Sequence, residues 1–307
     1  MKPVIIVGSI NLDMVYRVRR IPLAGETVLA RSLERYAGGK GANQAIAAAR
    51  MGARVCFVGR VGTDEAAEFM RNSLVQSGVE TEAIETSADA STGIALITVS
   101  DDGENCIVVN PGANALVDDD QLARHESLLS HAAYCVFQLE IPKKTVFAAI
   151  RHCRSLGVKT VLNPSPSAPI PDDVLACVSL LIVNQSEYAY LAGNEVDPVA
   201  FVRLKGITDM IITMGAQGLR HVTAQGTRFY PSVPVEAVDT TGAGDCFLGA
   251  LVAMRAEGRP MDESINIAMK AAAIAVTRPG AQRSMPYRDE VKMIEGKGDG
   301  SRASAKY

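Results

Sequence analysis

The sequence lacks patterns that mark several common protein classes. Its six cysteines form no Cys-x-x-Cys pair and sit mostly in apolar runs, which argues against a disulfide framework. The formal net charge is -3 and the pI is about 5.9, so no basic surplus favours binding to nucleic acid. The chain opens on a strand-like run at residues 4–7 without a longer apolar stretch behind a basic leader. We therefore expect neither a signal peptide nor a membrane span, and a cytoplasmic protein.

Several familiar catalytic motifs are also missing. The four histidines show neither the His-Glu-x-x-His pattern nor another metal-ligand spacing, and no Gly-x-Ser-x-Gly nucleophile elbow occurs. The Walker A loop and the Gly-x-Gly-x-x-Gly fingerprint after a strand are absent too. These absences argue against zinc enzymes, serine hydrolases and the two commonest nucleotide-binding motifs.

Short β-branched runs alternate with helical patterns over residues 4–276, which is typical of βαβ units. A chain of 307 residues with 48% hydrophobic content can bury a large core. The sequence therefore predicts an α/β fold, a doubly wound and mostly parallel sheet with helices on both faces. We expect strands at 4–10, 54–61, 134–138, 160–163, 180–183 and 210–213, and helices at 41–51, 65–77, 118–131, 143–156 and 187–192.

Two segments interrupt this alternation. Residues 14–36 and 92–110 carry strand-like patterns with no helix between them, as in Ile94, Leu96 and Val108. We predict that they pair into a small β-sheet lid over the site, and that the lid's apolar face forms a homodimer. The alternative is a pair of edge hairpins on the main sheet. The predicted division is a core of residues 1–13, 37–91 and 111–294, a lid of residues 14–36 and 92–110, and a flexible tail of residues 295–307.

The strongest functional signal is a glycine-rich turn that leads into an apolar helix. Gly242, Ala243, Gly244 and Asp245 precede the apolar periodic stretch that begins at Phe247. Backbone N–H groups at a helix N-terminus stabilise an anion such as a transferring phosphoryl group. Asp245 would lie at the edge of this anion pocket and accept the proton of an attacking hydroxyl. The alternative is an ordinary acid that complements the helix dipole.

A second glycine turn reads Gly-Gly-Lys-Gly-Ala-Asn-Gln-Ala at residues 38–45. Glycines allow close backbone approach to a polyhydroxylated ligand, and Asn43 offers hydroxyl groups both a donor and an acceptor. Taken alone, this segment could be no more than a tight turn.

Together these two segments resemble the two signatures of the ribokinase, or PfkB, family of carbohydrate kinases, and the similarity covers nearly the whole chain. The resemblance implies a ribokinase-like fold and an ATP-dependent sugar kinase with Asp245 as general base and a backbone anion hole at residues 242–245. The substrate-binding residues that it implies are Asn11, Asp13, Gly39, Lys40, Gly41, Ala42, Asn43, Glu140 and Asp245.

The resemblance also implies a nucleotide site. Asn184 and Glu187 match an Asn-x-x-Glu element whose Glu organises magnesium, usually through water, although the same residues could form a helix capping box. Residues 213–218 resemble the nucleotide loop after a strand, although they could be a hairpin turn. The implied ATP and anion-hole residues are Asn184, Thr213, Met214, Gly215, Ala216, Gln217, Gly218, Gly242, Ala243 and Gly244.

The family's activating monovalent cation, usually potassium, is held beside the anion pocket largely by oxygen atoms, many of them backbone carbonyls. Hard oxygen ligands suit such an ion. The resemblance places this cation at Asp239, Thr241, Ala275, Arg278, Gly280 and Ser284.

Within the family, five segments favour ribose as substrate, phosphorylated at its 5-hydroxyl: residues 8–13, 38–45, 138–140, 163–166 and 277–282. Related kinases for fructose, deoxyribose, ketodeoxygluconate or nucleosides share the catalytic loop, so Asp245 does not choose among them. A non-catalytic sugar-binding regulator on the same fold is a further alternative. Met269 stands where relatives often carry a polar residue near the adenine, which leaves the nucleotide preference open.

Overall fold

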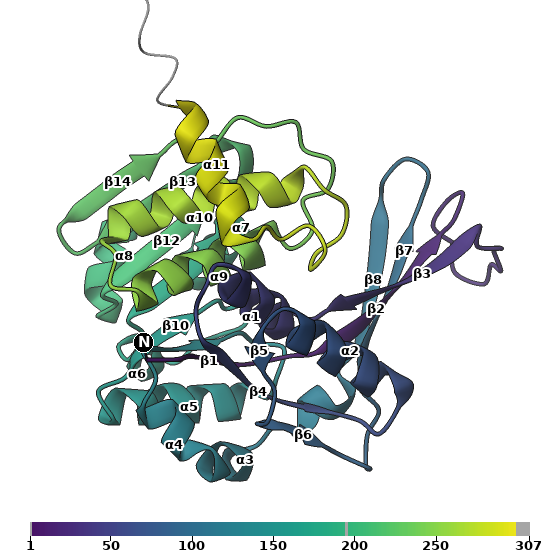
Figure 1. Cartoon of the computed structure of the whole chain (residues 1–307), viewed down its shortest axis with the longest axis horizontal. Coiled ribbons are helices and arrows are strands. Elements are labelled where there is room, and N and C mark those ends of the chain that lie inside the picture. Colours follow the sequence, from purple (N-terminus) through teal and green to yellow (C-terminus); the bar gives the residue numbers. More distant parts are fainter. Residues whose placement is uncertain (1, 194–195, 299–307) are drawn as a thin grey trace, which may run out of the picture.

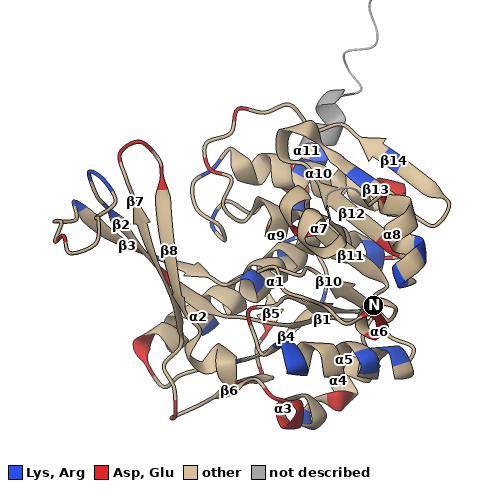
Figure 2. Cartoon of the chain, turned by 180° about the vertical axis from the view of Figure 1, so that it is seen from behind, with Lys and Arg blue, Asp and Glu red and all other residues tan. Residues whose placement is uncertain are grey.

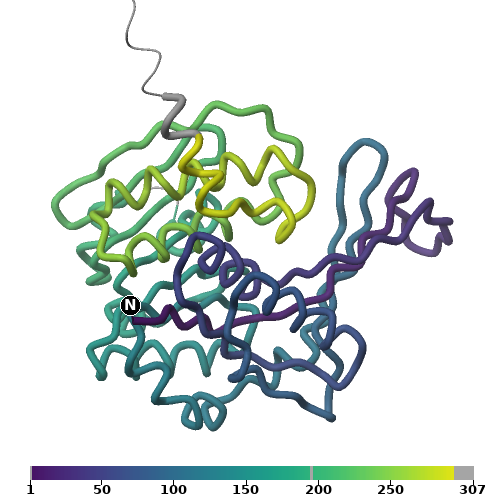
Figure 3. Tube along the Cα trace, in the orientation of Figure 1, coloured from purple at the N-terminus to yellow at the C-terminus, as the bar shows by residue number. Residues whose placement is uncertain are grey.

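The protein is described here by a computed structural model, which covers residues 2–193 and 196–298. A large α/β domain carries a small second sheet that projects from one side (Figures 1 and 3). The predicted fold class is thereby confirmed, and the alternative of two edge hairpins on the main sheet is excluded because the second sheet is separate. The last helix continues to Gly298, four residues into the predicted tail, and residues 299–307 lie outside the described residues.

The main sheet contains ten strands. They are β1 (Val4–Val7), β4 (Val55–Val61), β5 (Val79–Glu80), β6 (Ile84–Thr86), β9 (Tyr134–Phe137), β10 (Lys159–Leu162), β11 (Leu180–Asn184), β12 (Asp209–Thr213), β13 (Leu219–Thr223) and β14 (Gly226–Tyr230). Their order is β14-β13-β12-β11-β10-β9-β1-β4-β5, with β6 paired to β4. The pairs β12–β13 and β13–β14 are antiparallel, and the remaining pairs are parallel.

Helices cover both faces of this sheet. They are α1 (Lys40–Arg50), α2 (Glu65–Gln76), α3 (Asp119–Arg124), α4 (Glu126–Ser130), α5 (Lys143–Ser155), α6 (Asp172–Leu175), α7 (Gln185–Ala192), α8 (Pro198–Lys205), α9 (Ala243–Ala256), α10 (Met261–Val276) and α11 (Arg288–Gly298), with 3₁₀ turns η1 (Gly112–Leu116) and η2 (Gly215–Gln217). Helices α1, α2, α9 and α10 pack on one face, and α3, α4, α5, α6 and α8 on the other. Val4 and Ile6 of β1 face the first layer, while Ile5 and Val7 face the second, which explains the unbroken apolar run of a doubly covered strand.

Two predicted elements differ from the structure. The strand predicted at 4–10 ends at Val7, because at Gly8 the chain passes directly against α1, where a Cβ would lie 2.9 Å from Gly41 Cα. The helix predicted at 118–131 is two short helices, α3 and α4, that meet at His125. The apolar spacing of Leu122 and Leu129 continues across this break, so the sequence pattern does not reveal it.

The second sheet consists of β2 (Asn11–Arg17), β3 (Ser32–Gly38), β7 (Gly93–Val99) and β8 (Asn105–Asn110), in the order β3-β2-β7-β8. The strand register places Leu33, Leu96 and Val108 on one face and Asp13 on the other. The three apolar side chains are 44%, 43% and 62% exposed. This sheet therefore presents an apolar face to solvent and a carboxylate on its opposite side.

The blue positions of Lys and Arg and the red positions of Asp and Glu are interspersed along the ribbon in Figure 2. Three arginines near the start of the chain are paired at the surface: Arg17 with Glu34, Arg20 with Glu26, and Arg31 with Asp101. Within residues 2–193 and 196–298, no helix is long and apolar enough to cross a bilayer.

Candidate active site

A cavity of about 420 Å³ lies at the carboxyl ends of strands β10, β11 and β12. Loops that follow parallel strands meet at the same edge of a sheet, where open α/β folds bind their ligands. The first turns of α1 and α9 complete the wall. The lining residues are Lys40, Asn163, Ser165, Ile182, Val183, Asn184, Gln185, Ser186, Glu187, Thr213, Met214, Gly215, Gly242, Gly244 and Asp245.

Asp245 lies in the first turn of α9 and is 8% exposed. Asn43 Nδ2 donates to its Oδ2 over 3.0 Å, and Gln44 Nε2 donates to its Oδ1 over 2.9 Å. Gly242 precedes the helix with a φ of 73°, a left-handed conformation that glycine adopts at little cost. Among the described residues no side chain caps this helix, and Ala243 N donates to Thr240 O over 3.2 Å. Gly242, Gly244 and Asp245 of the same turn line the cavity, where a helix N-terminus favours an anion.

Burial raises the pKa of Asp245 above the ordinary range of a carboxyl group. The Lys40 ammonium and the amide donors of Asn43 and Gln44 oppose this effect, while Glu140 reinforces it. The carboxylate is therefore buried, of raised pKa, and supplied with hydrogen bonds that stabilise its ionised form. A buried carboxyl group whose pKa is raised in a cavity wall is a candidate for proton transfer.

Helices α1 and α9 approach each other closely because glycine removes a side chain from their contact. A Cβ on Gly249 of α9 would lie 2.5 Å from Gln44 O and 2.6 Å from Ala47 Cβ. At the start of α1, a Cβ on Gly41 would lie 2.7 Å from Ser9 N. These close contacts fix α1 against both the end of β1 and α9, which brings the two amides onto Asp245.

The remaining charges of the site lie close to Asp245. Glu140 Oε2 accepts hydrogen bonds from Ser9 Oγ over 2.5 Å and from Lys40 N over 3.1 Å. Burial lowers the pKa of the Lys40 ammonium, but Asp245, Glu140 and Glu187 together raise it more, so its net pKa is raised. Lys40 therefore stays charged and is the cation that balances these carboxylates.

Burial raises the pKa of Asp13 to about 7, and repulsion from Glu140 and Asp245 adds to the effect. The folded protein thus keeps a proton that the unfolded chain loses near pH 3.8, so the cost of ionising Asp13 grows until the pH passes about 7. We expect Asp13→Asn to raise Tm by an amount that grows between about pH 4 and about pH 7 and is constant above. Thermal unfolding across this range measures the difference, and a difference independent of pH would contradict the expectation.

Asn11 is held by an amide clamp where the small sheet leaves the core. Asn114 Nδ2 donates to Asn11 Oδ1 over 2.8 Å and to Ile10 O over 3.0 Å, and Asn114 Oδ1 accepts from Ile10 N over 2.9 Å. A Cβ on Gly93 would lie within 2.3 Å of both side chains, so this position requires glycine. The clamp fixes the base of the sheet beside Asp13.

Asn184 and Glu187 form the capping box that the sequence left open as an alternative. Asn184 Oδ1 accepts from Glu187 N over 2.8 Å, and Glu187 Oε2 accepts from Asn184 N over 2.9 Å. Both residues also line the cavity. The capping role fixes the Glu187 carboxylate at the cavity wall, where it also acts on Lys40.

The loop after β12 is a tight turn into the antiparallel strand β13, with Met214 N donating to Gly218 O over 2.8 Å. Thr213, Met214 and Gly215 line the cavity. Of the predicted ATP and anion-hole residues, Ala216, Gln217 and Gly218 of this turn and Ala243 of α9 lie outside the lining. The predicted sugar-site residues outside the lining are Asn11, Asp13, Gly39, Gly41, Ala42, Asn43 and Glu140. Of these, Ala42 lies in the core with its N–H bonded to Ser9 O.

Asp239 joins two segments that the sequence assigned to one cation site. Its Oδ1 accepts from Thr241 N over 2.9 Å and its Oδ2 from Gly280 N over 2.8 Å. Burial raises the pKa of this carboxyl, but the hydrogen bonds from Thr241 and Gly280 outweigh burial, and the net pKa is lowered. An ionised carboxylate is therefore fixed beside the α9 turn.

The other residues predicted for the cation lie in the same region. Ala275 O accepts from Arg278 N over 3.1 Å, and Ser284 Oγ donates to Ala281 O over 2.7 Å. Within the described ranges, no group of three His, Cys, Asp or Glu residues could hold a metal ion. One carboxylate with neutral oxygens fits a weakly held monovalent ion better than a divalent one.

Several polar residues of the site were not predicted. Gln138 Nε2 donates to Gln44 Oε1 over 2.6 Å, and Gln44 Nε2 also donates to Asn163 Oδ1 over 3.3 Å. The three residues occur within segments singled out in the sequence, so their position in a motif was the available signal. Gln282 belongs to such a segment as well, whereas Asn114 has no motif around it.

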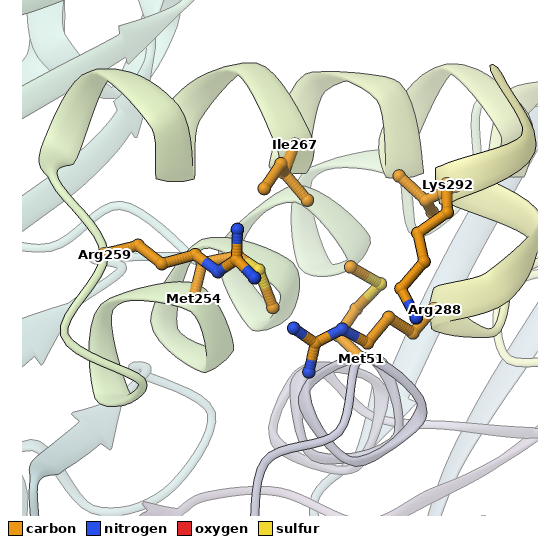
Figure 4. Close-up of a pocket in the computed structure, with 7 residues that line it drawn as sticks. Met51, Met254, Arg259, Ile267, Arg288 and Lys292 are labelled. Carbon is orange, nitrogen blue, oxygen red and sulfur yellow. The ribbon is translucent and has the colours of Figure 1, made fainter. Parts of the chain in front are cut away.

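A second cavity, of about 180 Å³, lies between α1, α9, α10 and α11 (Figure 4). Its cations are Arg259, Arg288 and Lys292. Each has a carboxylate neighbour: Arg288 and Arg259 bond to Glu257, and Lys292 bonds to Asp289. The positive charges at this cavity are already paired with carboxylates, so the cavity does not offer an anion a binding site. Its ion pairs instead stabilise the contact between the helices.

The profile of the pfkB family carbohydrate kinases matches residues 1–288 of the chain. A ribokinase of Haemophilus influenzae is 38% identical over 297 residues, covering 94% of this chain and 97% of the relative. A deoxyribokinase of Salmonella typhi is 32% identical over 289 residues, covering 92% and 94%. The solved structure of Arabidopsis thaliana ribokinase complexed with ribose and ATP superposes with a TM-score of 0.87 at 29% identity, covering 95% of this chain and 98% of that one.

The match extends over almost the entire chain, and the relatives share the architecture of a main sheet with a small second sheet. It includes both glycine turns, at residues 38–45 and 238–247, around which the cavity is built. The chain therefore belongs to the pfkB family of carbohydrate kinases, enzymes that phosphorylate sugars with ATP.

Proposed function

We propose that the chain phosphorylates the 5-hydroxyl of D-ribose with ATP, giving ribose 5-phosphate and ADP. The observation that carries this proposal is Asp245, a buried carboxylate held by two amide donors at the uncapped N-terminus of α9, beside a cavity at the ends of the parallel strands. The names of the relatives, among them several ribokinases, support ribose as the sugar.

Asp245 acts in this proposal as the general base. It accepts the proton of the sugar's hydroxymethyl group as that oxygen attacks the γ-phosphorus of ATP, while the bond from this phosphorus to the bridging oxygen breaks and ADP leaves. The N–H groups of residues 242–245 and the Lys40 ammonium stabilise the charge that develops on the transferring group. The proposal assigns the sugar contacts to Asn11, Asp13, Asn43 and Glu140, of which Asn43 also donates to Asp245.

The residues present fit the two ions that such an enzyme uses. Magnesium is commonly held by one or two carboxylates together with substrate phosphates and water, and Glu187 is the carboxylate on the nucleotide side of the cavity. Bound magnesium would neutralise part of the charge on the phosphates of ATP. The Asp239 carboxylate and the backbone carbonyls near Gly280 would hold potassium. The bound ion would then help to join the segment before α9 to the segment after α10.

The proposal is tested by ADP release in the presence of ATP, magnesium and potassium, with ribose, deoxyribose, fructose, ketodeoxygluconate and adenosine compared at equal concentration. A clear preference for ribose supports it. The deoxyribokinase relative makes deoxyribose the second candidate, and a preference for that sugar would keep the kinase mechanism while replacing the substrate. Binding of a sugar without turnover on any of them would favour a non-catalytic regulator.

We also propose that the small sheet is a lid that joins two copies of the chain, and that the enzyme works in the cytoplasm. Leu33, Leu96 and Val108 form an exposed apolar face on this sheet, while Asp13 lies on the opposite face toward the site. Such a face is expected to be covered, since exposed contiguous apolar surface marks an interface.

Val108→Glu is expected to convert the dimer to monomer, because it places a charge on the buried face of the interface. Light scattering at micromolar concentration measures the mass in solution. Leu204→Glu is the matched control, since Leu204 is 77% exposed on α8 and lies outside the small sheet. A parent protein that is monomeric at this concentration would remove the proposed interface.

A further inference from the structure

Gln282 is buried and is connected to Asp245 only through Asn43, which lies between them. Its side chain is 4% exposed, its Nε2 donates to Asn43 Oδ1 over 3.0 Å, and its Oε1 accepts from Ser73 Oγ over 2.8 Å. Asn43 Nδ2 donates in turn to Asp245 Oδ2 over 3.0 Å. Four side chains therefore form one hydrogen-bonded chain from α2 through the 277–287 loop and α1 to the carboxylate on α9.

The direction of each bond in this chain follows from the charge at its end. An ionised carboxylate only accepts hydrogen bonds, so Asn43 must present its amide N–H₂ group to Asp245 and its oxygen to the other side. That buried oxygen requires a donor, which Gln282 supplies through its own N–H₂ group. The oxygen of Gln282 then faces Ser73, whose hydroxyl rotates to donate.

If the Asn43 amide were reversed, groups of like partial charge would face each other on both of its sides. If Asn43 turned over, its oxygen would face the Asp245 carboxylate and its N–H₂ group would face the N–H₂ group of Gln282. Both contacts are repulsive, and each leaves a buried group without a partner. Gln282 does not simply turn with Asn43, because its Nε2 also donates to Gly38 O over 3.5 Å, and it therefore adds to the cost of the wrong orientation of Asn43.

We propose that Gln282 is a positioning residue, which locks the Asn43 amide in the orientation that donates to Asp245 and so holds the catalytic carboxylate in place for proton transfer. The inference rests on the proposed function, in which Asp245 is the base. Gln282 acts only through Asn43, whereas Gln44 reaches the carboxylate directly.

The charged groups that face Asp245 do not replace this donor. They are Lys40 from α1, Glu140 from the segment after β9, and Asp13 from β2. Lys40 favours the ionised base, and the two carboxylates disfavour it. Loss of the Asn43 donor is therefore expected to raise the pKa of the base and to move the acid limb of the rate profile to higher pH.

Two substitutions separate this role from simple packing. Gln282→Met keeps the length of the side chain but removes both hydrogen bonds, so Asn43 Oδ1 loses its buried donor and the amide is held by Asp245 alone. Gln282→Glu accepts from the Asn43 N–H₂ group and forces its oxygen toward Asp245. We expect kcat to fall on the order of tenfold for methionine and further for glutamate, with KM for the sugar changing less than kcat.

The matched control is Arg283→Gln, one residue along the same loop. Arg283 is exposed and lies over the Tyr36 ring at 5.2 Å, without contact to the hydrogen-bonded chain. This variant should keep the parent kcat and the parent acid limb. Thermal unfolding of each variant verifies that it is folded at the assay temperature.

The decisive measurement is the dependence of kcat on pH for the parent and the three variants, with Asp245→Asn assayed beside them. An acid limb about one pH unit higher for Gln282→Met, with a lower kcat, supports the inference. A kcat and an acid limb of Gln282→Met equal to those of the parent would overturn the inference. This holds even if Gln282→Glu is slow, because the inserted charge alone would then explain the lower kcat of the glutamate variant. Parental turnover by Asp245→Asn would instead overturn the proposed function itself.

Discussion

Asp245→Asn is expected to lower kcat by a factor on the order of 100 to 10,000 while sugar binding is retained, because the base is lost but the cavity is not. The parent carboxylate accepts from both Asn43 and Gln44. The asparagine has one acceptor oxygen, so one of these two donors loses its acceptor. We therefore expect a moderate loss of stability in addition to the loss of turnover.

Turnover is measured by ADP release with saturating ATP, and sugar binding by calorimetry in the absence of turnover. Thermal unfolding provides the control for folding. Unchanged turnover in a folded variant would remove Asp245 from the role of base, and loss of sugar binding together with turnover would assign it to binding only.

Gly249→Ala is the second prediction with a large expected effect. A methyl group at this position would lie 2.5 Å from Gln44 O and 2.6 Å from Ala47 Cβ, and the backbone of α1 must move to make room. Overpacking of this kind costs about 1–3 kcal/mol, which outweighs the gain in helix propensity of roughly 1 kcal/mol. Because the displaced segment carries Gln44, kcat should fall as well.

Gly244→Ala is the matched control for stability, since a Cβ at Gly244 meets no atom within 4 Å on the same helix. Chemical denaturation of both variants measures the free energy of unfolding. Equal stability of the two variants would show that α1 and α9 are not held at the limit of contact, and would contradict the packing account of the site.

Much of the fold followed from local patterns. The apolar runs at β1, β9 and β11 and the periodic helices between them predicted a doubly covered parallel sheet, which the structure confirms. The break at His125 escaped prediction because the apolar spacing runs through it, and the early end of β1 escaped because it depends on contact with α1, far along the chain.

The candidate site was also predictable in part, because two of its segments carry local sequence patterns. Glycine turns that begin helices indicate an anion pocket from sequence alone, and the structure brings both turns to one cavity. The amides that orient the carboxylate could not be found in this way. Folding alone brings Gln44 to Asp245 and Gln138, and Gln282 to Asn43, and a glutamine in a sequence carries no mark of whether its amide is buried.

The measurement that tests the central claim most directly is the identity of the product formed from ribose and ATP. Phosphorus and proton magnetic resonance of the reaction mixture locates the phosphoryl group on the sugar. The account predicts ribose 5-phosphate, with phosphorus coupled to the protons of carbon 5, and strongly reduced formation by Asp245→Asn. A phosphoryl group on another oxygen of ribose, or a product formed equally fast by Asp245→Asn, would contradict it.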